Sequence, residues 1–120
     1  MCTKGVLEVM EQSWGNISIE YDKNKLTKLK FGSNILLLSE EELRNVYSLM
    51  MVITKSKILY PAGYTMDLGN VELIFYKYRQ QIIGIYARRT DKAKLNGVRI
   101  SFEKFNSIYH FIEKCLKEDK

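Results

Sequence analysis

The chain has 120 residues, 46% of them hydrophobic and 28% charged, with one proline and a net charge of +5. That composition predicts one compact domain with a real core and excludes a disordered or proline-rich chain. No apolar run approaches the roughly 20 residues of a bilayer span, and the first ten residues lack the apolar block of a signal peptide. We therefore expect no membrane association and an intracellular location, cytoplasmic or nuclear, or the host cell if the protein is viral.

The first half of the chain reads as strands followed by one helix. Strands are predicted at 16–22, 26–31 and 34–38, after a weaker candidate near 6–10. A three-residue loop at 23–25 would place the apolar side chains of the first two strands on one face and oppose Glu20 to Lys28 on the other.

An amphipathic helix follows, because apolar residues recur at helical spacing from Leu43 to Ile53. Ser39 and Glu42 have the spacing of a capping box at its start.

The second half repeats this plan after a linker at 56–70. Its predicted strands are 71–79, 81–89 and 98–102, with a weaker candidate at 64–68. A second amphipathic helix then runs from about Phe105 to Leu116, with Ser101 as the candidate cap.

The two helical ends align at an offset of 62 residues. This offset superimposes identical residues, namely Asn34 on Asn96, Ser39 on Ser101 and Tyr47 on Tyr109. We therefore predict an internal repeat, with unit one at 1–55 and unit two at 71–120. The expected fold class is α+β: two tandem β-β-β-(β)-α repeats that pack as a pseudo-dimer within one chain and form a single domain over 1–120.

Positive charge is concentrated in the second half. Between Lys77 and Arg99 there are seven Lys or Arg residues against one acid, Asp91. Such a cluster favours a polyanionic partner, although the same charge also serves solubility. Lysine outnumbers arginine 14 to 5, which points to an AT-rich genome such as that of a virus or phage.

The hairpin of the second half decides which residues share a face. If Gln80 and Gln81 form a two-residue loop, Lys77 pairs with Gly84. The predicted core face then holds Ile74, Tyr76, Tyr78, Ile83, Ile85 and Ala87. The predicted outer face holds Phe75, Lys77, Arg79, Gly84, Tyr86 and Arg88, which combines rings for unstacked bases with cations for phosphates. A three-residue loop would reverse this parity, and rings packed under a helix are the alternative interpretation.

The segment Gly97-Val98-Arg99-Ile100-Ser101, followed by an amphipathic helix, resembles the end of the positive-cofactor-four family of transcriptional coactivators. Pur-alpha repeats and Whirly proteins share this strands-then-helix plan and bind single-stranded nucleic acid. The resemblance covers mainly 71–112 and implies a single-stranded DNA or RNA binder in transcription or replication, with a polymerase or transcription factor as a further partner. Unit one departs from the motif, since Ile35 stands where the motif has glycine.

The face argument and the charge cluster, and not the resemblance, supply the candidate binding residues. They are Phe75, Lys77, Arg79, Tyr86, Arg88, Arg89, Lys92, Lys94 and Arg99.

Catalytic and metal-binding motifs are missing from the sequence. His110 lies on the polar side of the last helix, and Cys2 and Cys115 make neither a disulfide framework nor a zinc knuckle. We therefore expect no enzyme activity, no cofactor and no metal. The rival hypothesis is a protein-interaction module, such as a viral accessory factor; either a monomer or a homodimer is compatible with the sequence.

Overall fold

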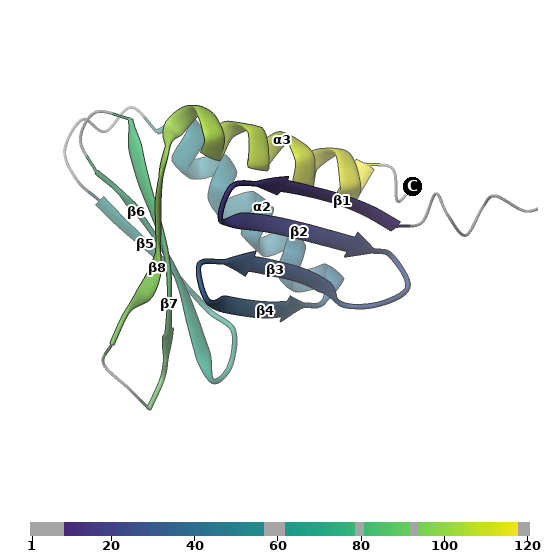
Figure 1. Cartoon of the computed structure of the whole chain (residues 1–120), viewed down its shortest axis with the longest axis horizontal. Coiled ribbons are helices and arrows are strands. Elements are labelled where there is room, and N and C mark those ends of the chain that lie inside the picture. Colours follow the sequence, from purple (N-terminus) through teal and green to yellow (C-terminus); the bar gives the residue numbers. More distant parts are fainter. Residues whose placement is uncertain (1–8, 57–61, 79–80, 92–93, 118–120) are drawn as a thin grey trace, which may run out of the picture.

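The computed structural model describes residues 9–56, 62–78, 81–91 and 94–117. These residues form two antiparallel four-stranded sheets, each followed by an α-helix (Figure 1). The first sheet has the order β1 (Val9–Trp14), β2 (Ile17–Asp22), β3 (Thr27–Phe31) and β4 (Asn34–Leu38), and α2 (Glu40–Lys55) follows it. The second sheet has the order β5 (Ala62–Asp67), β6 (Val71–Lys77), β7 (Ile82–Arg89) and β8 (Asn96–Ser101), and α3 (Phe102–Lys117) follows it.

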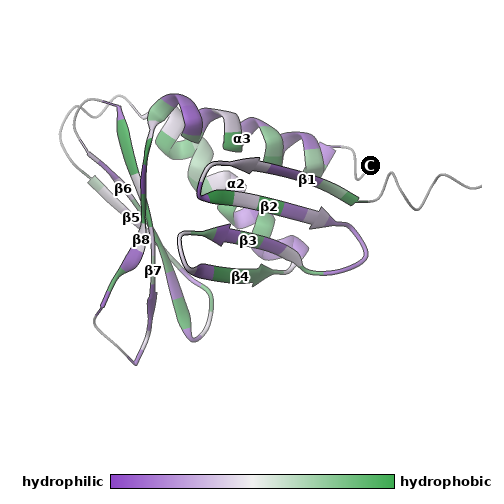
Figure 2. Cartoon of the chain, in the orientation of Figure 1, coloured by the Kyte–Doolittle hydropathy of each residue, from purple (hydrophilic) through white to green (hydrophobic). Residues whose placement is uncertain are grey.

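The first sheet has the predicted register. Ile19 pairs with Leu29 in the β2–β3 ladder, and Glu20 pairs with Lys28 on the outer face. Because strand side chains alternate between faces, Ile19 and Leu29 are buried while Glu20 and the loop residues are exposed. Figure 2 shows the resulting alternation of hydrophilic and hydrophobic residues along these strands.

Both helices begin where the sequence predicts. The Ser39 side chain accepts a hydrogen bond from the Glu42 backbone N–H at 3.1 Å, and Glu42 Oε1 accepts one from the Ser39 N–H at 2.9 Å. This capping box satisfies two N–H groups that the first helical turn leaves unpaired. At α3, Ser101 Oγ accepts from the Lys104 N–H at 3.1 Å, so Ser101 is the cap.

The two units contact each other through residues that the 62-residue offset aligns. Helices α2 and α3 have 16 residues each and begin 62 positions apart. Two pairs that the 62-residue offset aligns are in direct contact: Asn34 Nδ2 donates to the Asn96 carbonyl at 3.0 Å, and the rings of Tyr47 and Tyr109 stack at 5.2 Å with 6° between their planes. Equivalent residues touch each other only near a symmetry axis, so the predicted tandem pseudo-dimer is confirmed.

The core lies between the inner faces of both sheets and the two helices. Its large side chains include Phe31, Phe75 and Phe105, all almost fully buried. Phe75 of β6 meets Phe105 of α3 edge to face, with ring centroids 5.9 Å apart. Neither sheet could cover its inner face without the helices, which explains why the two units share one core.

Several predicted boundaries differ from the structure. Strand β5 corresponds to the weaker candidate at 64–68 and lies inside the predicted linker 56–70, so unit two starts no later than Ala62. Strand β1 is Val9–Trp14, and residues 6–8 of the weaker candidate near 6–10 lie outside the described residues. Cys115 is buried in the core as expected, whereas Cys2 lies outside the described residues. Within the described ranges, no helix is long and apolar enough to cross a membrane.

Candidate nucleic-acid interface

The β6–β7 hairpin differs from its predicted register by one residue. Lys77 pairs with Ile83 and not with Gly84, and the Tyr78 N–H donates to the Ile82 carbonyl at 2.9 Å. Three residues, 79–81, therefore separate Tyr78 from Ile82. A one-residue slip moves every side chain of a strand to the other face, so the predicted faces of β6 are exchanged.

The exchange removes Phe75 and Lys77 from the predicted binding face. Phe75 is 2% exposed and belongs to the core, which corrects its assignment as a binding residue. Lys77 lies at the end of β6 on the inner side, where its Nζ donates to the Ser56 carbonyl at 3.2 Å. Its role in the structure is to tie β6 to the residue that follows α2.

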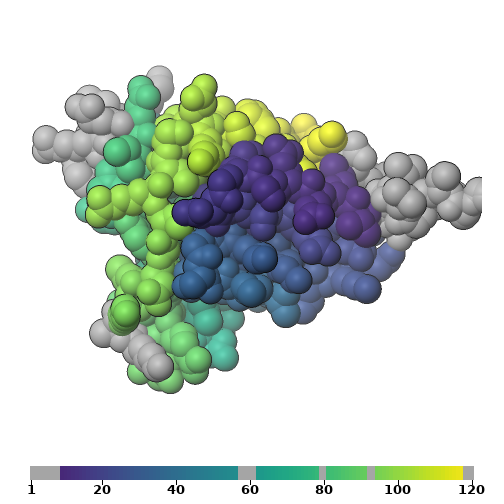
Figure 3. Space-filling view, in the orientation of Figure 1, coloured from purple at the N-terminus to yellow at the C-terminus, as the bar shows by residue number. Residues whose placement is uncertain are grey.

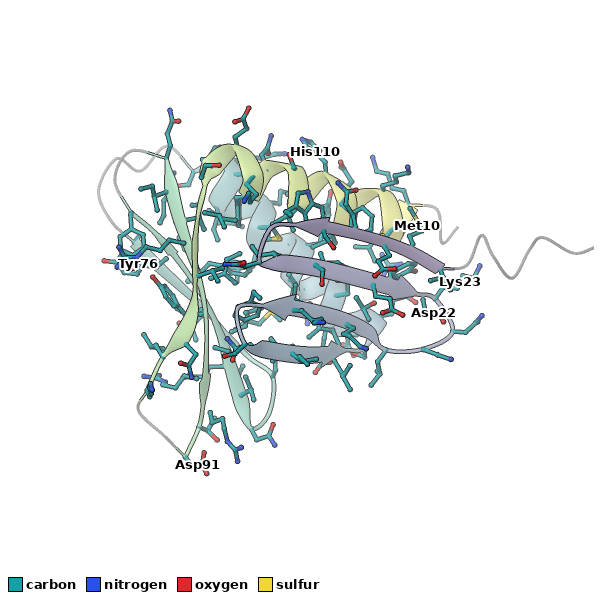
Figure 4. The ribbon with its side chains drawn as sticks, viewed as in Figure 1. Met10, Asp22, Lys23, Tyr76, Asp91 and His110 are labelled. Atoms are coloured by element: carbon teal, nitrogen blue, oxygen red, sulfur yellow. The ribbon has the colours of Figure 1, made fainter. Side chains whose placement is uncertain are left out.

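Strand β7 keeps its predicted faces. Ile83, Ile85 and Ala87 are buried, and Tyr86 and Arg88 alternate with them on the outer face. Ile74, Tyr76 and Tyr78, which were predicted to be core residues, lie half-buried on that outer face. Figure 4 shows Tyr76 projecting from the side of the second sheet that is turned away from the helices.

The outer face of the second sheet carries a cluster of rings and one guanidinium, which we call the tyrosine face: Tyr76, Tyr78, Tyr86 and Arg99. The hydroxyl oxygens of Tyr78 and Tyr86 lie 2.6 Å apart and share a hydrogen bond. Arg99 Nε donates to Tyr86 Oη at 3.3 Å, and Arg99 Cζ lies 4.8 Å from the centroid of the Tyr78 ring. The Tyr76 and Tyr78 centroids are 4.6 Å apart at 51°. Rings and charge are therefore interleaved on one surface.

Gly84 leaves space for the Tyr86 ring, and Gly97 allows two backbones to approach closely. A Cβ atom at Gly84 would lie 2.4 Å from Cε2 of Tyr86, so the ring crosses the space that any other residue would fill. At Gly97, opposite Tyr86 in the β7–β8 ladder, a Cβ would lie 1.9 Å from the Ile85 carbonyl oxygen. Gly97 is thus required by the close approach of two backbones.

The electrostatics of the cluster follow from these contacts. The hydrogen bond with Tyr86, and secondly burial, raise the pKa of Tyr78 above its usual value, while the Arg99 charge opposes this. The same tyrosines raise the pKa of Arg99, led by its hydrogen bond to Tyr86. At neutral pH the Tyr78 hydroxyl is therefore protonated, and Arg99 gives the tyrosine face a positive charge.

The remaining predicted cations lie elsewhere. Arg88 is on the outer face, but its guanidinium is ion-paired to Glu72, with Nε at 2.9 Å from Oε1. Arg89 and Lys94 are exposed and line a cleft on the inner side of the second sheet. Arg79 and Lys92 lie outside the described residues. Of the nine predicted residues, the structure thus places Tyr86, Arg88 and Arg99 together on one outer face.

The outer face of the first sheet has a different character. Lys30 lies opposite Ser18, and Lys28 opposite Glu20, so part of its positive charge faces an acid. Its β4 edge presents two aliphatic side chains, Ile35 at 59% and Leu37 at 56% exposed. Pseudo-symmetry therefore does not extend to the outer surfaces of the two sheets.

Sequence reasoning missed Tyr76 and Tyr78 as surface residues. The alternation along β6 held a signal, since Leu73 and Phe75 have no polar atoms whereas Tyr76 and Tyr78 each carry a hydroxyl that needs a partner or water. This pattern favours the hydroxyl-bearing side as the outer one.

Two further features concern histidine and possible metal ligands. His110 is exposed, as predicted, with Nδ1 3.4 Å from Glu113 Oε1. Among the residues described, no group of three or more His, Cys, Asp or Glu side chains is placed to hold a metal ion.

Comparison with known proteins shows the fold and no more. No family model matches the chain, and no curated protein sequence matches it. A solved structure that is similar is the 1.80 Å crystal structure of a protein of unknown function from the DUF155 family, from Prochlorococcus sp. NATL2A. The TM-score is 0.54 at 8% sequence identity, over 90% of this chain and 98% of that chain.

Proposed function

We propose that this protein binds single-stranded DNA or RNA, with little sequence preference, on the outer face of the second sheet. The observation that carries the proposal is the tyrosine face, where Tyr78 and Tyr86 contact the guanidinium of Arg99 and Tyr76 packs against Tyr78. In this proposal the protein acts in transcription or replication.

The chemistry of a single strand matches this surface. Unstacked bases expose flat π faces that stack on aromatic rings, and every base has such a face, so recognition by stacking tolerates any sequence. The phosphates need positive charge, which Arg99 supplies beside the rings. Because Arg88 is neutralised by Glu72, we expect it to contribute less than its position suggests.

The architecture is compatible with the resemblance noted in the sequence. Two strands-then-helix units that pair within one chain correspond to the arrangement of Pur-alpha repeats. In the proposed function only unit two keeps the binding role, because the outer face of the first sheet pairs Lys28 with Glu20 and has exposed aliphatic residues at Ile35 and Leu37.

Fluorescence anisotropy of a labelled single-stranded 20-mer, titrated with protein at several salt concentrations, tests the proposal. We expect similar affinities for different base compositions, weaker binding to duplex, and a decrease of log K with log salt of roughly 0.7 per phosphate contacted. Arg99→Glu should weaken binding by about tenfold or more, because it removes one cation from the stacking surface and adds an acid.

Lys30→Glu is the matched control, since it makes the same charge change on the outer face of the first sheet. It should leave the affinity within about twofold. An equal loss in both variants would mean that net charge, and not the tyrosine face, determines binding. No binding at low salt would contradict the proposed function.

The alternative function is a protein-interaction module, and the exposed Ile35 and Leu37 favour it. Adjacent aliphatic residues on an edge strand are unusual unless a partner covers them. An Ile35→Lys/Leu37→Lys variant separates the two functions: it should abolish a protein contact made there and leave oligonucleotide binding unchanged.

A further inference from the structure

A cleft of about 390 Å³ lies where the β3–β4 corner of the first sheet meets the β7–β8 end of the second. In Figure 3 these are the blue and green surfaces that meet in the lower left of the molecule. The cleft is on the inner side of the second sheet, because Val71, Ala87 and Arg89 alternate with the outer-face residues of β6 and β7. It is therefore separate from the tyrosine face.

Both units contribute polar groups to this cleft. Ser33 and Asn34 come from unit one, and Lys94 and Asn96 from unit two, at the point where Asn34 Nδ2 donates to the Asn96 carbonyl. The cleft thus lies between the two units. A site built from both halves forms only when the whole domain is folded.

The charge of the cleft is positive. Arg89 and Lys94 line it, and the nearest acid to Arg89 is Asp91, with Oδ1 at 3.4 Å from Nε. Both partners of that ion pair are about two-thirds exposed, so water and salt weaken their attraction and an incoming anion can compete for the guanidinium. Arg88 also touches the cleft, but Glu72 holds it.

Apolar side chains also line the cleft. Leu36, Val71 and Ala87 form an apolar wall beside the cations, so the cleft offers positive charge to an anion and apolar surface to an uncharged ring or chain. The volume falls in the range of about 300–1,000 Å³ that is typical of sites for small organic ligands. A phosphate ion fills only a small part of it.

We propose that this cleft binds a phosphorylated, nucleotide-sized ligand. The phosphoryl group lies at Arg89 and Lys94, and the organic part lies against Leu36, Val71 and Ala87. The ligand chemistry is that of a mononucleotide, either free or as the phosphorylated end of a single strand. This inference does not depend on the proposed function, because it uses different residues on the other side of the sheet.

The test uses two-dimensional NMR of the full chain, titrated with inorganic phosphate and with adenosine monophosphate. We expect both ligands to shift the backbone amides of Asn34, Asn96 and their neighbours, and the mononucleotide to bind at least about tenfold more tightly because it also covers the apolar wall. Shifts that are absent from these amides at millimolar ligand, or equal affinities for the two ligands, would overturn the proposal.

An Arg89→Glu/Lys94→Glu variant should weaken mononucleotide binding at least tenfold. Lys28→Glu/Lys30→Glu is the control, with the same charge change on the first sheet; an equal loss in both overturns the site. Arg89 and Lys94 are exposed, so we expect the double variant to fold. If it does not fold, the Lys94→Ala variant is used in its place, and it should also bind the mononucleotide more weakly.

Two oligonucleotides that differ only in a 5′ phosphate distinguish the source of the ligand. Tighter binding of the phosphorylated strand, lost in the cleft variant, identifies the strand end. Equal binding of the two strands together with mononucleotide binding identifies a free nucleotide. The Arg99→Glu variant should retain mononucleotide binding, so failure of the tyrosine face and failure of the cleft give different results.

Discussion

Gly84→Ala is the most direct test of the Tyr86 ring as a stacking surface. The new Cβ would lie 2.4 Å from Cε2 and 2.7 Å from Cζ and Oη of Tyr86. Carbon atoms in contact prefer about 3.5–4.0 Å, so the ring must move by roughly 1 Å or more. That movement breaks the 2.6 Å hydrogen bond to Tyr78 unless Tyr78 follows.

The structure predicts a small effect on stability and a larger one on binding. Gly84 does not have a positive φ, so alanine fits the backbone and gains about 0.5–1 kcal/mol from reduced chain entropy. The lost hydrogen bond costs about 0.5–1.5 kcal/mol, which nearly cancels that gain. Loss of one stacking ring costs about 1–3 kcal/mol of binding, or about 5- to 150-fold in affinity.

Three measurements check this reasoning. Oligonucleotide anisotropy gives the affinity, urea denaturation gives the free energy of unfolding, and ultraviolet titration of tyrosinate gives the pKa of Tyr78, which should fall because its hydrogen bond to Tyr86 is the main cause of the increase. Gly63→Ala is the control, since its Cβ would meet Tyr76 at an ordinary 3.4 Å. A Tyr78 pKa that falls while the affinity stays unchanged would refute the ring as a stacking surface.

The other predictions concern stability, measured by chemical denaturation. Gly97→Ala should destabilise the fold by about 1–3 kcal/mol or more, because its Cβ meets backbone atoms that cannot turn away; wild-type stability would contradict the close strand approach. Ser39→Ala should cost about 1 kcal/mol through loss of the capping box, and no change would mean that the cap is redundant. The neighbouring Tyr109, then burial, then Glu113 raise the pKa of Tyr47 above its usual value of 10.0. The contribution of Tyr47 to the free energy of unfolding is therefore complete below pH 10.0 and is lost as the pH rises above that value. The Tyr47→Phe variant should lose less stability than the wild type over that alkaline range. The hydrogen bonds from Tyr47 and then His110 lower the pKa of Glu113. Its contribution to the free energy of unfolding is therefore lost as the pH falls below 4.5. The stability of Glu113→Gln should decrease less steeply in acid than that of the wild type.

The register of each hairpin shows what sequence reasoning could and could not predict. In unit one, the turn after β2 contains Asp22 and Asn24, residues that favour turns, and Asp22 Oδ1 accepts from the Asn24 N–H at 2.9 Å. The loop length, the register and the buried face were all predicted correctly there. In unit two, Gln81 takes a φ of 69°, a conformation in which glycine or asparagine is usually found. The loop sequence contains neither residue, so it did not predict this conformation.

The three-residue loop therefore removed Phe75 and Lys77 from the predicted site. In β7 the buried residues Ile83, Ile85 and Ala87 alternate with glycine or polar residues, so the faces of this strand could be predicted without the loop length. Tyr86 and Arg88 therefore lie on the outer face, as predicted. Strand β6 has bulky apolar or aromatic residues on both faces, so the assumed loop length decided the prediction, and Phe75 was exchanged with Tyr76. The helices were predictable because capping residues and 3.6-residue periodicity are local signals, and the pseudo-twofold arrangement followed from the 62-residue offset.

The contact between the two ends of the chain determines when folding can finish during synthesis. Trp14 of β1 meets Phe111 of α3 edge to face at 5.4 Å, nearly a hundred residues later in the chain. As the ribosome releases the first sheet and α2, the inner face of that sheet has no second unit to cover it. Contacts of such long range slow folding and leave apolar surface exposed meanwhile. We therefore expect the nascent chain to need a chaperone, or to stay partly unfolded, until α3 has emerged.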